Sequence, residues 1–277
     1  GVTLFALFVL ANKILRDAQK SLVAVFFYAL NISLFANFYW VATSYFSLGV
    51  FFFLMAAIFY LQKGKWSLIG LYIFAVLAIG TNELAFVLPG IFILLNWFFK
   101  DWPKKFWIFT GFDLVLIILR TLIAGLPKAS DYAIKINLSV FSNLRWYGLR
   151  ALNLPEGVNR TADSIIWIAF LVFILTLLYA VWKYRKFGHR NSKVLAVGAG
   201  WFIVSALPFF FIPGHMSSYY LTFSLLGSAI VLAEIFGKSK LIYLAGIAYL
   251  ILTISGLHFL SQTHWIILKN TGPVGSF

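Results

Sequence analysis

Long apolar runs alternate with short clusters of charged residues along the whole chain. The runs are apolar on every side, so the period of an amphipathic helix cannot be read inside them. We nevertheless predict helices, because a backbone segment in lipid must satisfy its own N–H and C=O groups. The pattern predicts about ten spans: Val2 to Asn12, Leu22 to Ala36, Leu48 to Gln62, Ser67 to Gly80, Leu84 to Phe99, Phe106 to Ile123, Ile165 to Trp182, Val194 to Ile212, Tyr220 to Phe236 and Leu241 to Ser255.

The composition agrees with this pattern. Apolar residues make up 62% of the 277 residues and charged residues 11%, with a mean hydropathy of +0.93. A soluble domain carries about 25% charged residues, so a soluble globular protein is excluded. The absence of cysteine excludes a disulfide framework and a thiolate metal site. We therefore predict an all-α, polytopic transmembrane bundle that forms a single domain over residues 1–277.

The net charge of +14 predicts how the bundle is oriented. If the turn after the first run is cytoplasmic and the spans alternate, the cytoplasmic turns collect 15 of the 22 basic residues. Basic turns remain on the cytoplasmic side of a membrane, so we predict a multi-pass protein of a bacterial inner or plasma membrane. The sequence has no folded basic domain that could bind nucleic acid, so we do not expect a nucleic-acid partner. The 15 residues are Lys13, Arg16, Lys20, Lys63, Lys65, Lys100, Lys104, Lys105, Lys183, Arg185, Lys186, Arg190, Lys193, Lys238 and Lys240.

One predicted extracytoplasmic segment, residues 126–163, is long and amphipathic. We expect it to contain an interfacial helix with Trp146 at the depth of the lipid headgroups. The apolar face that we predict for this helix contains Val140, Leu144, Tyr147, Leu149 and Leu152.

Ionisable residues within or beside spans are candidates for function, because burying a charge in lipid is costly. Glu234 lies four residues before Lys238, which predicts an ion pair at the end of a helix. Glu83 lies in a tight outer turn. Either it takes part in catalysis, or it lies at the start of a helix that Thr81 or Asn82 caps, where a carboxylate is favourable. His215 lies in a second outer turn, where an interfacial role is the alternative.

Five of the ionisable residues project towards the extracytoplasmic side in this topology. Such a set suits an anionic, lipid-linked substrate, and Arg120 together with Arg145 or Arg150 would bind its phosphate, since arginine contacts phosphate oxygens in pairs. No recognisable metal-ligand cluster is present, so a divalent metal has no support from the sequence. The five residues are Glu83, Arg120, Arg145, Arg150 and His215.

Four stretches of the sequence resemble segments of one membrane-enzyme superfamily, and they occur in the same order. They are LFANFYWVATSYFSLGVFFFLMAAIFYL, GTNELAFVLPGIFIL, FDLVLIILRTLIAG and HMSSYYLTFSLLGSAIVLAE. Together they resemble the GT-C superfamily of integral-membrane glycosyltransferases. The chain is most similar to its bacterial branch, related to protein O-mannosyltransferases and tetratricopeptide-linked mannosyltransferases.

This resemblance implies the transfer of a sugar from a polyprenyl-phosphate donor to a protein or glycan acceptor on the extracytoplasmic face. It implies that Glu83 is the carboxylate of a catalytic turn and that Arg120, Tyr219 and Tyr220 bind substrate. His215 is a second catalytic candidate because of its position in an outer turn. The principal acidic base of the family lies in its first outer loop. We expect that loop upstream of Gly1, so the chain is expected to be an N-terminally truncated fragment that is inactive alone. No cofactor is evident.

Other functions fit the same pattern. A transporter or flippase for a lipid-linked or anionic substrate, an O-antigen polymerase or ligase, and a non-catalytic membrane scaffold are the alternatives. A transporter often has broken helices in two repeated halves. The helix-breaking residues Pro89, Pro208 and Pro213 do not occupy matching halves, which favours the transferase.

Overall fold

The computed structural model describes the chain except for residues 40, 125–133, 159–162, 184–188, 215 and 265–277. For residues 41, 42, 44, 83, 121, 124, 189 and 190 it describes the backbone alone. Within the described residues the regular secondary structure is helix, with no strand, so the predicted all-α class is confirmed. The helices are α1 (Val2–Leu15), α2 (Ala18–Ala29), η1 (Ile32–Leu34), α3 (Phe35–Tyr39), α4 (Val41–Tyr60), α5 (Lys65–Thr81), η2 (Glu83–Val87), α6 (Leu88–Phe99), α7 (Lys104–Ala124), α8 (Ser139–Ala151), α9 (Ser164–Lys183), α10 (His189–Phe210), η4 (Ser218–Thr222), α11 (Leu225–Phe236) and α12 (Leu241–Thr263).

Three of the described helices are long and apolar enough to cross a membrane: Ser164–Lys183, Asn191–Phe210 and Leu241–Thr263. A fourth segment, Ala18–Ala29 with Ile32–Tyr39, meets the same criteria as a pair bent by 54°. Five shorter apolar helices accompany them. These helix lengths are compatible with a membrane protein. The number of helices long enough to be full spans is smaller than the ten spans that the sequence predicts.

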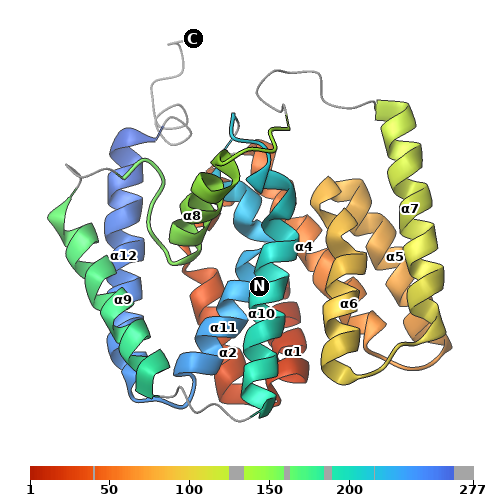
Figure 1. Cartoon of the computed structure of the whole chain (residues 1–277), viewed down its shortest axis with the longest axis horizontal. Helices are drawn as coiled ribbons and strands as arrows, with labels where there is room; N and C mark the ends of the chain where they lie inside the picture. The colour runs from red at the N-terminus through yellow and green to blue at the C-terminus, as the bar shows by residue number, and fades with distance from the viewer. Residues whose placement is uncertain (40, 125–133, 159–162, 184–188, 215, 265–277) are drawn as a thin grey trace.

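The turns of the bundle gather at two opposite ends (Figure 1). One end is formed by the turns that follow α1, α4, α6 and α11, and we call it the basic end. There the Lys238 ammonium lies 2.7 Å from the Asp17 carboxylate, and Lys105 donates a hydrogen bond of 2.8 Å to the carbonyl of Gln62. The other end, which we call the α8 end, carries α8 (Figure 1), and η1 and η4 contact this helix.

Close contact between α10 and α11 forms the centre of the bundle. A Cβ atom on Gly227 would lie 2.3 Å from the carbonyl oxygen of Gly198, so the two backbones touch at these glycines. Beside this contact the fully buried Trp201 donates a hydrogen bond of 3.2 Å to the carbonyl of Phe223. Small residues allow helices in lipid to pack this closely.

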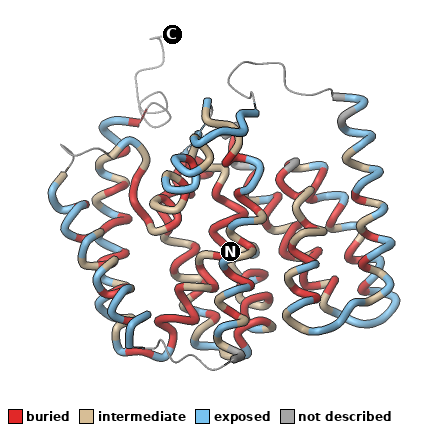
Figure 2. Tube along the Cα trace, viewed as in Figure 1, coloured by how far each residue is buried: buried red, intermediate tan, exposed pale blue. Residues whose placement is uncertain are grey.

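The outer helices expose apolar side chains. Figure 2 shows buried residues running through the central helices, whereas α7 and α9 present exposed residues along their outer sides. The exposed stripe of α9 is Ile165, Ile168, Leu171, Leu175 and Leu178. Such a continuous apolar surface is rare on a soluble monomer and fits contact with lipid tails.

Candidate functional site

Helix α8 and the segment before it are held on the bundle by hydrogen bonds to the end of α10 and to the residue after it. The side-chain amide of Asn143 donates to the carbonyl of Phe210 at 2.8 Å, and the N–H of Lys135 donates to the carbonyl of Phe211 at 2.8 Å. The last carbonyls of a helix lack partners within that helix, so these contacts satisfy groups that would otherwise be unpaired.

The face that α8 buries differs from the predicted one. The buried residues are Asn143, Tyr147, Arg150 and Ala151, whereas Leu144 is 39% exposed. The prediction of a helix in this segment is confirmed, but its apolar face is rotated. The physical reason is that Asn143 turns inward to cap α10.

Arg150 is the buried cation of the α8 end. Its side chain is 6% exposed, and its guanidinium carbon lies 4.4 Å from the centre of the Trp146 ring. The Nε atom has no hydrogen-bond partner among the described residues. Burial lowers the pKa of Arg150 to about 10, and the negative charge of Glu156 opposes that shift. Arg150 therefore stays protonated at neutral pH, and within the described ranges no atom accepts a hydrogen bond from its Nε–H group.

Glu156 is a largely buried carboxylate at the same end. Its Oε2 atom accepts a hydrogen bond of 3.0 Å from the N–H of Ser218, and its Oε1 atom lies 3.8 Å from Nε2 of His264. Burial raises the pKa of Glu156, but hydrogen bonds from His264 and Ser218 outweigh burial and hold the pKa below its usual value. The carboxylate thus ties together the segment after α8, η4 and the end of α12.

Buried asparagines fix the backbone around Arg150. The side-chain amide of Asn31 donates to the carbonyl of Ala151 at 3.1 Å and to the hydroxyl of Tyr249 at 2.8 Å. Asn153 has φ 75° and is fully buried. Its Oδ1 atom accepts from the N–H of Ile32 at 2.6 Å, while its amide donates to the carbonyl of Tyr249 at 3.0 Å. The end of α8 is therefore anchored to η1 and α12.

Tyr219 and Tyr220 lie in η4, which packs beside α8. The ring of Tyr220 stacks on Phe209 with centroids 4.1 Å apart, and the ring of Tyr219 lies 5.5 Å from Phe46. Both tyrosines are half-buried in this aromatic packing. The structure thus brings Arg150, Tyr219 and Tyr220 to one end of the bundle.

The other predicted site residues lie elsewhere or outside the described part. Arg120 is exposed on α7, which Figure 1 places at one edge of the molecule, away from α8. Arg145 is exposed on α8. Glu83 begins η2 directly after Asn82, whose side chain caps that helix by accepting from the N–H of Leu84 at 2.8 Å. The side chain of Glu83 and the whole of His215 lie outside the described residues.

The predicted pair of Glu234 with Lys238 is wrong. Glu234 instead pairs with Lys20 of α2 at 2.7 Å, and Lys238 pairs with Asp17. Lys20 comes from α2 and Asp17 from the turn before it, and a rule based on spacing within one helix cannot foresee partners from another element. Asp113 is buried on α7, and its Oδ1 atom has no hydrogen-bond partner in the described part of the chain.

The sequence analysis missed Glu156 and His264 as members of the site. Glu156 lies between Pro155 and Gly157 directly after the amphipathic helix, and an acidic residue in such a turn was the available signal. The described residues contain no group of three or more His, Cys, Asp or Glu side chains that could hold a metal ion.

Comparisons of the chain with known protein families, with characterised proteins and with solved structures find no match.

Proposed function

We propose that the chain belongs to a multi-pass membrane glycosyltransferase, which transfers a sugar from a polyprenyl-phosphate donor to a protein or glycan acceptor. The observation that carries this proposal is the buried guanidinium of Arg150, whose Nε has no partner in the described part of the chain. A buried charge with unused hydrogen-bonding capacity is costly unless something anionic compensates it. The phosphate of a lipid-linked donor has the charge and the oxygen atoms to do so.

The arrangement of the turns supports an extracytoplasmic position for Arg150. The described turns that carry Lys13, Lys63 and Lys238 lie at the basic end, opposite α8. By the positive-inside rule the basic end faces the cytoplasm. We propose that the long helices, the bent pair and the shorter apolar helices cross the membrane together as about ten spans. The α8 end is then exposed on the extracytoplasmic side of a bacterial inner or plasma membrane.

The chemistry assigns different roles to the two buried charges. Arg150 would bind the phosphate that departs from the sugar and stabilise its growing negative charge in the transition state. Glu156 has a lowered pKa, which makes it a poor proton acceptor. It is better suited to hold the backbone of Ser218 and to act on Arg150 through its negative charge.

A transfer assay with the full-length protein tests this proposal. Purified protein is incubated with labelled polyprenyl-phosphate mannose and acceptor-containing membranes. Arg150→Gln should lower turnover about a hundredfold, equivalent to roughly 3 kcal/mol of transition-state stabilisation. Arg150→Lys keeps the charge and should retain part of the activity.

Lys135→Gln is the matched control, because it removes an exposed cation near α8 and should leave turnover unchanged. Thermal unfolding establishes that each variant is folded. Absence of transfer by the parent protein, or equal turnover in folded Arg150→Gln and the parent, would contradict the proposal.

A further inference from the structure

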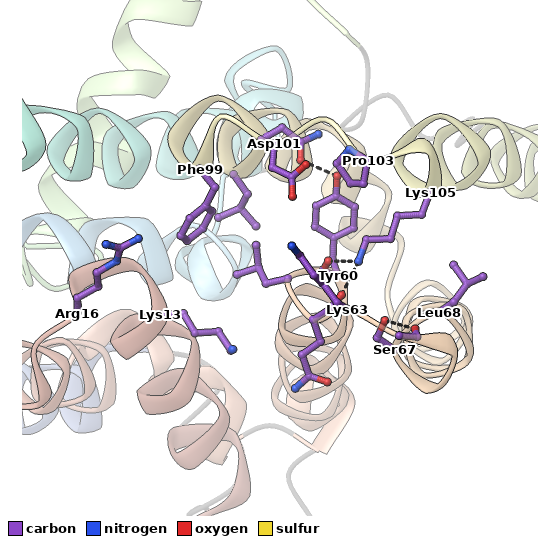
Figure 3. A pocket seen from close by; sticks show the side chains of 15 residues that line it. Lys13, Arg16, Tyr60, Lys63, Ser67, Leu68, Phe99, Asp101, Pro103 and Lys105 are labelled. Carbon is purple, nitrogen blue, oxygen red and sulfur yellow. Dashed lines mark hydrogen bonds between the residues drawn. The ribbon is translucent and has the colours of Figure 1, made fainter.

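A second polar feature lies at the basic end, opposite the site described above. A cavity of about 760 Å³ opens there between the turns that follow α1, α4 and α6. Figure 3 shows side chains from these three turns around it, including Lys13, Arg16, Lys63 and Asp101. Ligand pockets in proteins span about 300–1,000 Å³, so the cavity has room for a small molecule or a lipid headgroup.

The lining of this cavity is strongly cationic. It contains Lys13, Arg16, Lys63 and Lys105 but one acidic residue, Asp101. Lys105 is engaged by the end of α4, because its ammonium donates to the carbonyls of Tyr60 and Gln62. The three remaining cations form no ion pair with another described residue. Like charges gathered around one space repel one another, and an anion between them would remove that repulsion.

Asn96 adds an independent indication. This residue lines the cavity and is 3% exposed. Its Oδ1 atom accepts a hydrogen bond of 2.6 Å from the hydroxyl of Tyr60. Its Nδ2 atom is buried and has no hydrogen-bond partner among the described residues. A buried donor without an acceptor is costly, and a ligand with oxygen atoms would satisfy it.

We propose that this cavity is a binding site for a phosphate-bearing anion. Lys13, Arg16 and Lys63 supply the positive charge, Arg16 can contact two phosphate oxygens at once, and Asn96 supplies a neutral donor. The phosphate can belong to the headgroup of an anionic phospholipid or to a soluble phosphorylated compound. The site lies at the other end of the bundle from Arg150, so it does not rest on the proposed glycosyl transfer.

Binding to the purified chain in a neutral maltoside detergent and phosphate-free buffer tests this proposal. The probes are inorganic pyrophosphate, phosphatidylglycerol and phosphatidylcholine, and the readout is the rise of Tm with probe concentration, which gives an apparent Kd. The test variant is Arg16→Gln/Lys63→Gln, because both side chains are exposed and their loss leaves the packing intact. The matched control is Lys104→Gln/Lys240→Gln, which removes two exposed cations near the same end outside the cavity.

We expect saturable binding to the parent and the control, with Kd raised about tenfold or more in the test variant. Saturation by pyrophosphate assigns the site to soluble phosphorylated compounds. Saturation by phosphatidylglycerol without a response to pyrophosphate or phosphatidylcholine assigns it to anionic headgroups. The proposal is overturned if no probe saturates, if phosphatidylcholine binds as well as phosphatidylglycerol, or if both variants lose affinity equally.

Discussion

The ammonium of Lys20 lies 2.7 Å from the carboxylate of Glu234, a residue 214 positions further along the chain. The side chains are 13% and 2% exposed, so this pair joins α2 to α11 away from water. Removing one partner of a buried ion pair leaves the other charge uncompensated. The pair is therefore a direct probe of how these two helices pack.

Glu234→Gln should lower the free energy of unfolding by about 3 kcal/mol, because the Lys20 ammonium then remains buried without its counter-charge. The double variant Lys20→Met/Glu234→Leu, which removes both charges, should lose less. Unfolding in detergent, followed by tryptophan fluorescence, measures both. Equal stability of Glu234→Gln and the parent protein would show that the pair does not join the helices.

The contact between α10 and α11 gives a second prediction. In Gly227→Ala the new Cβ atom would meet the carbonyl of Gly198 at 2.3 Å and the backbone nitrogen of Phe202 at 2.6 Å. The helices must separate, which should cost about 1–3 kcal/mol. Gly111→Ala in α7 is the control, since no heavy atom lies within 4 Å of its new Cβ, and it should be neutral or slightly stabilising. Thermal unfolding in detergent distinguishes the two variants. Identical melting temperatures would contradict the close packing of α10 against α11.

Glu156 gives a prediction about pH. Its folded-state pKa lies below the usual value of 4.5, so its carboxylate stabilises the fold above that pH. This stability is lost as the pH falls through the folded-state pKa, because the unfolded chain binds the proton first. Glu156→Gln should therefore lower Tm at pH 7, and the difference from the parent should shrink as the pH falls below about 4.5. A difference that stays constant down to pH 3.5 would exclude this role for the carboxylate.

Most helix positions could be predicted from the sequence because apolar runs and charged turns are local features. The cap formed by Asn82 could be foreseen for the same reason, as its bond to Leu84 spans two residues. The predicted span Leu22 to Ala36 is wrong as one helix, since the chain bends by 54° between α2 and η1. Pairs between distant elements could not be foreseen. Glu156 and His264 meet across 108 positions, and no spacing within one helix indicates such a contact.

The choice between Arg145 and Arg150 shows a second limit of prediction from the sequence. Five residues along a helix correspond to roughly 140° of rotation, so one of the two faces the bundle when the other faces away. The sequence could not decide between them, because the predicted apolar face included Leu144, which is exposed. The capping bond of Asn143 to α10 sets the rotation of α8 and thereby buries Arg150.

Labelling of introduced cysteines tests most directly whether the α8 end and the basic end face opposite sides of a membrane, as we propose. The chain contains no cysteine, so Ser142→Cys in α8 and Lys63→Cys at the basic end each provide a single, exposed thiol. In intact bacterial cells a membrane-impermeant maleimide should label Ser142→Cys, whereas Lys63→Cys should react after permeabilisation alone. Labelling of Lys63→Cys in intact cells, or protection of Ser142→Cys until the membrane is opened, would contradict the account.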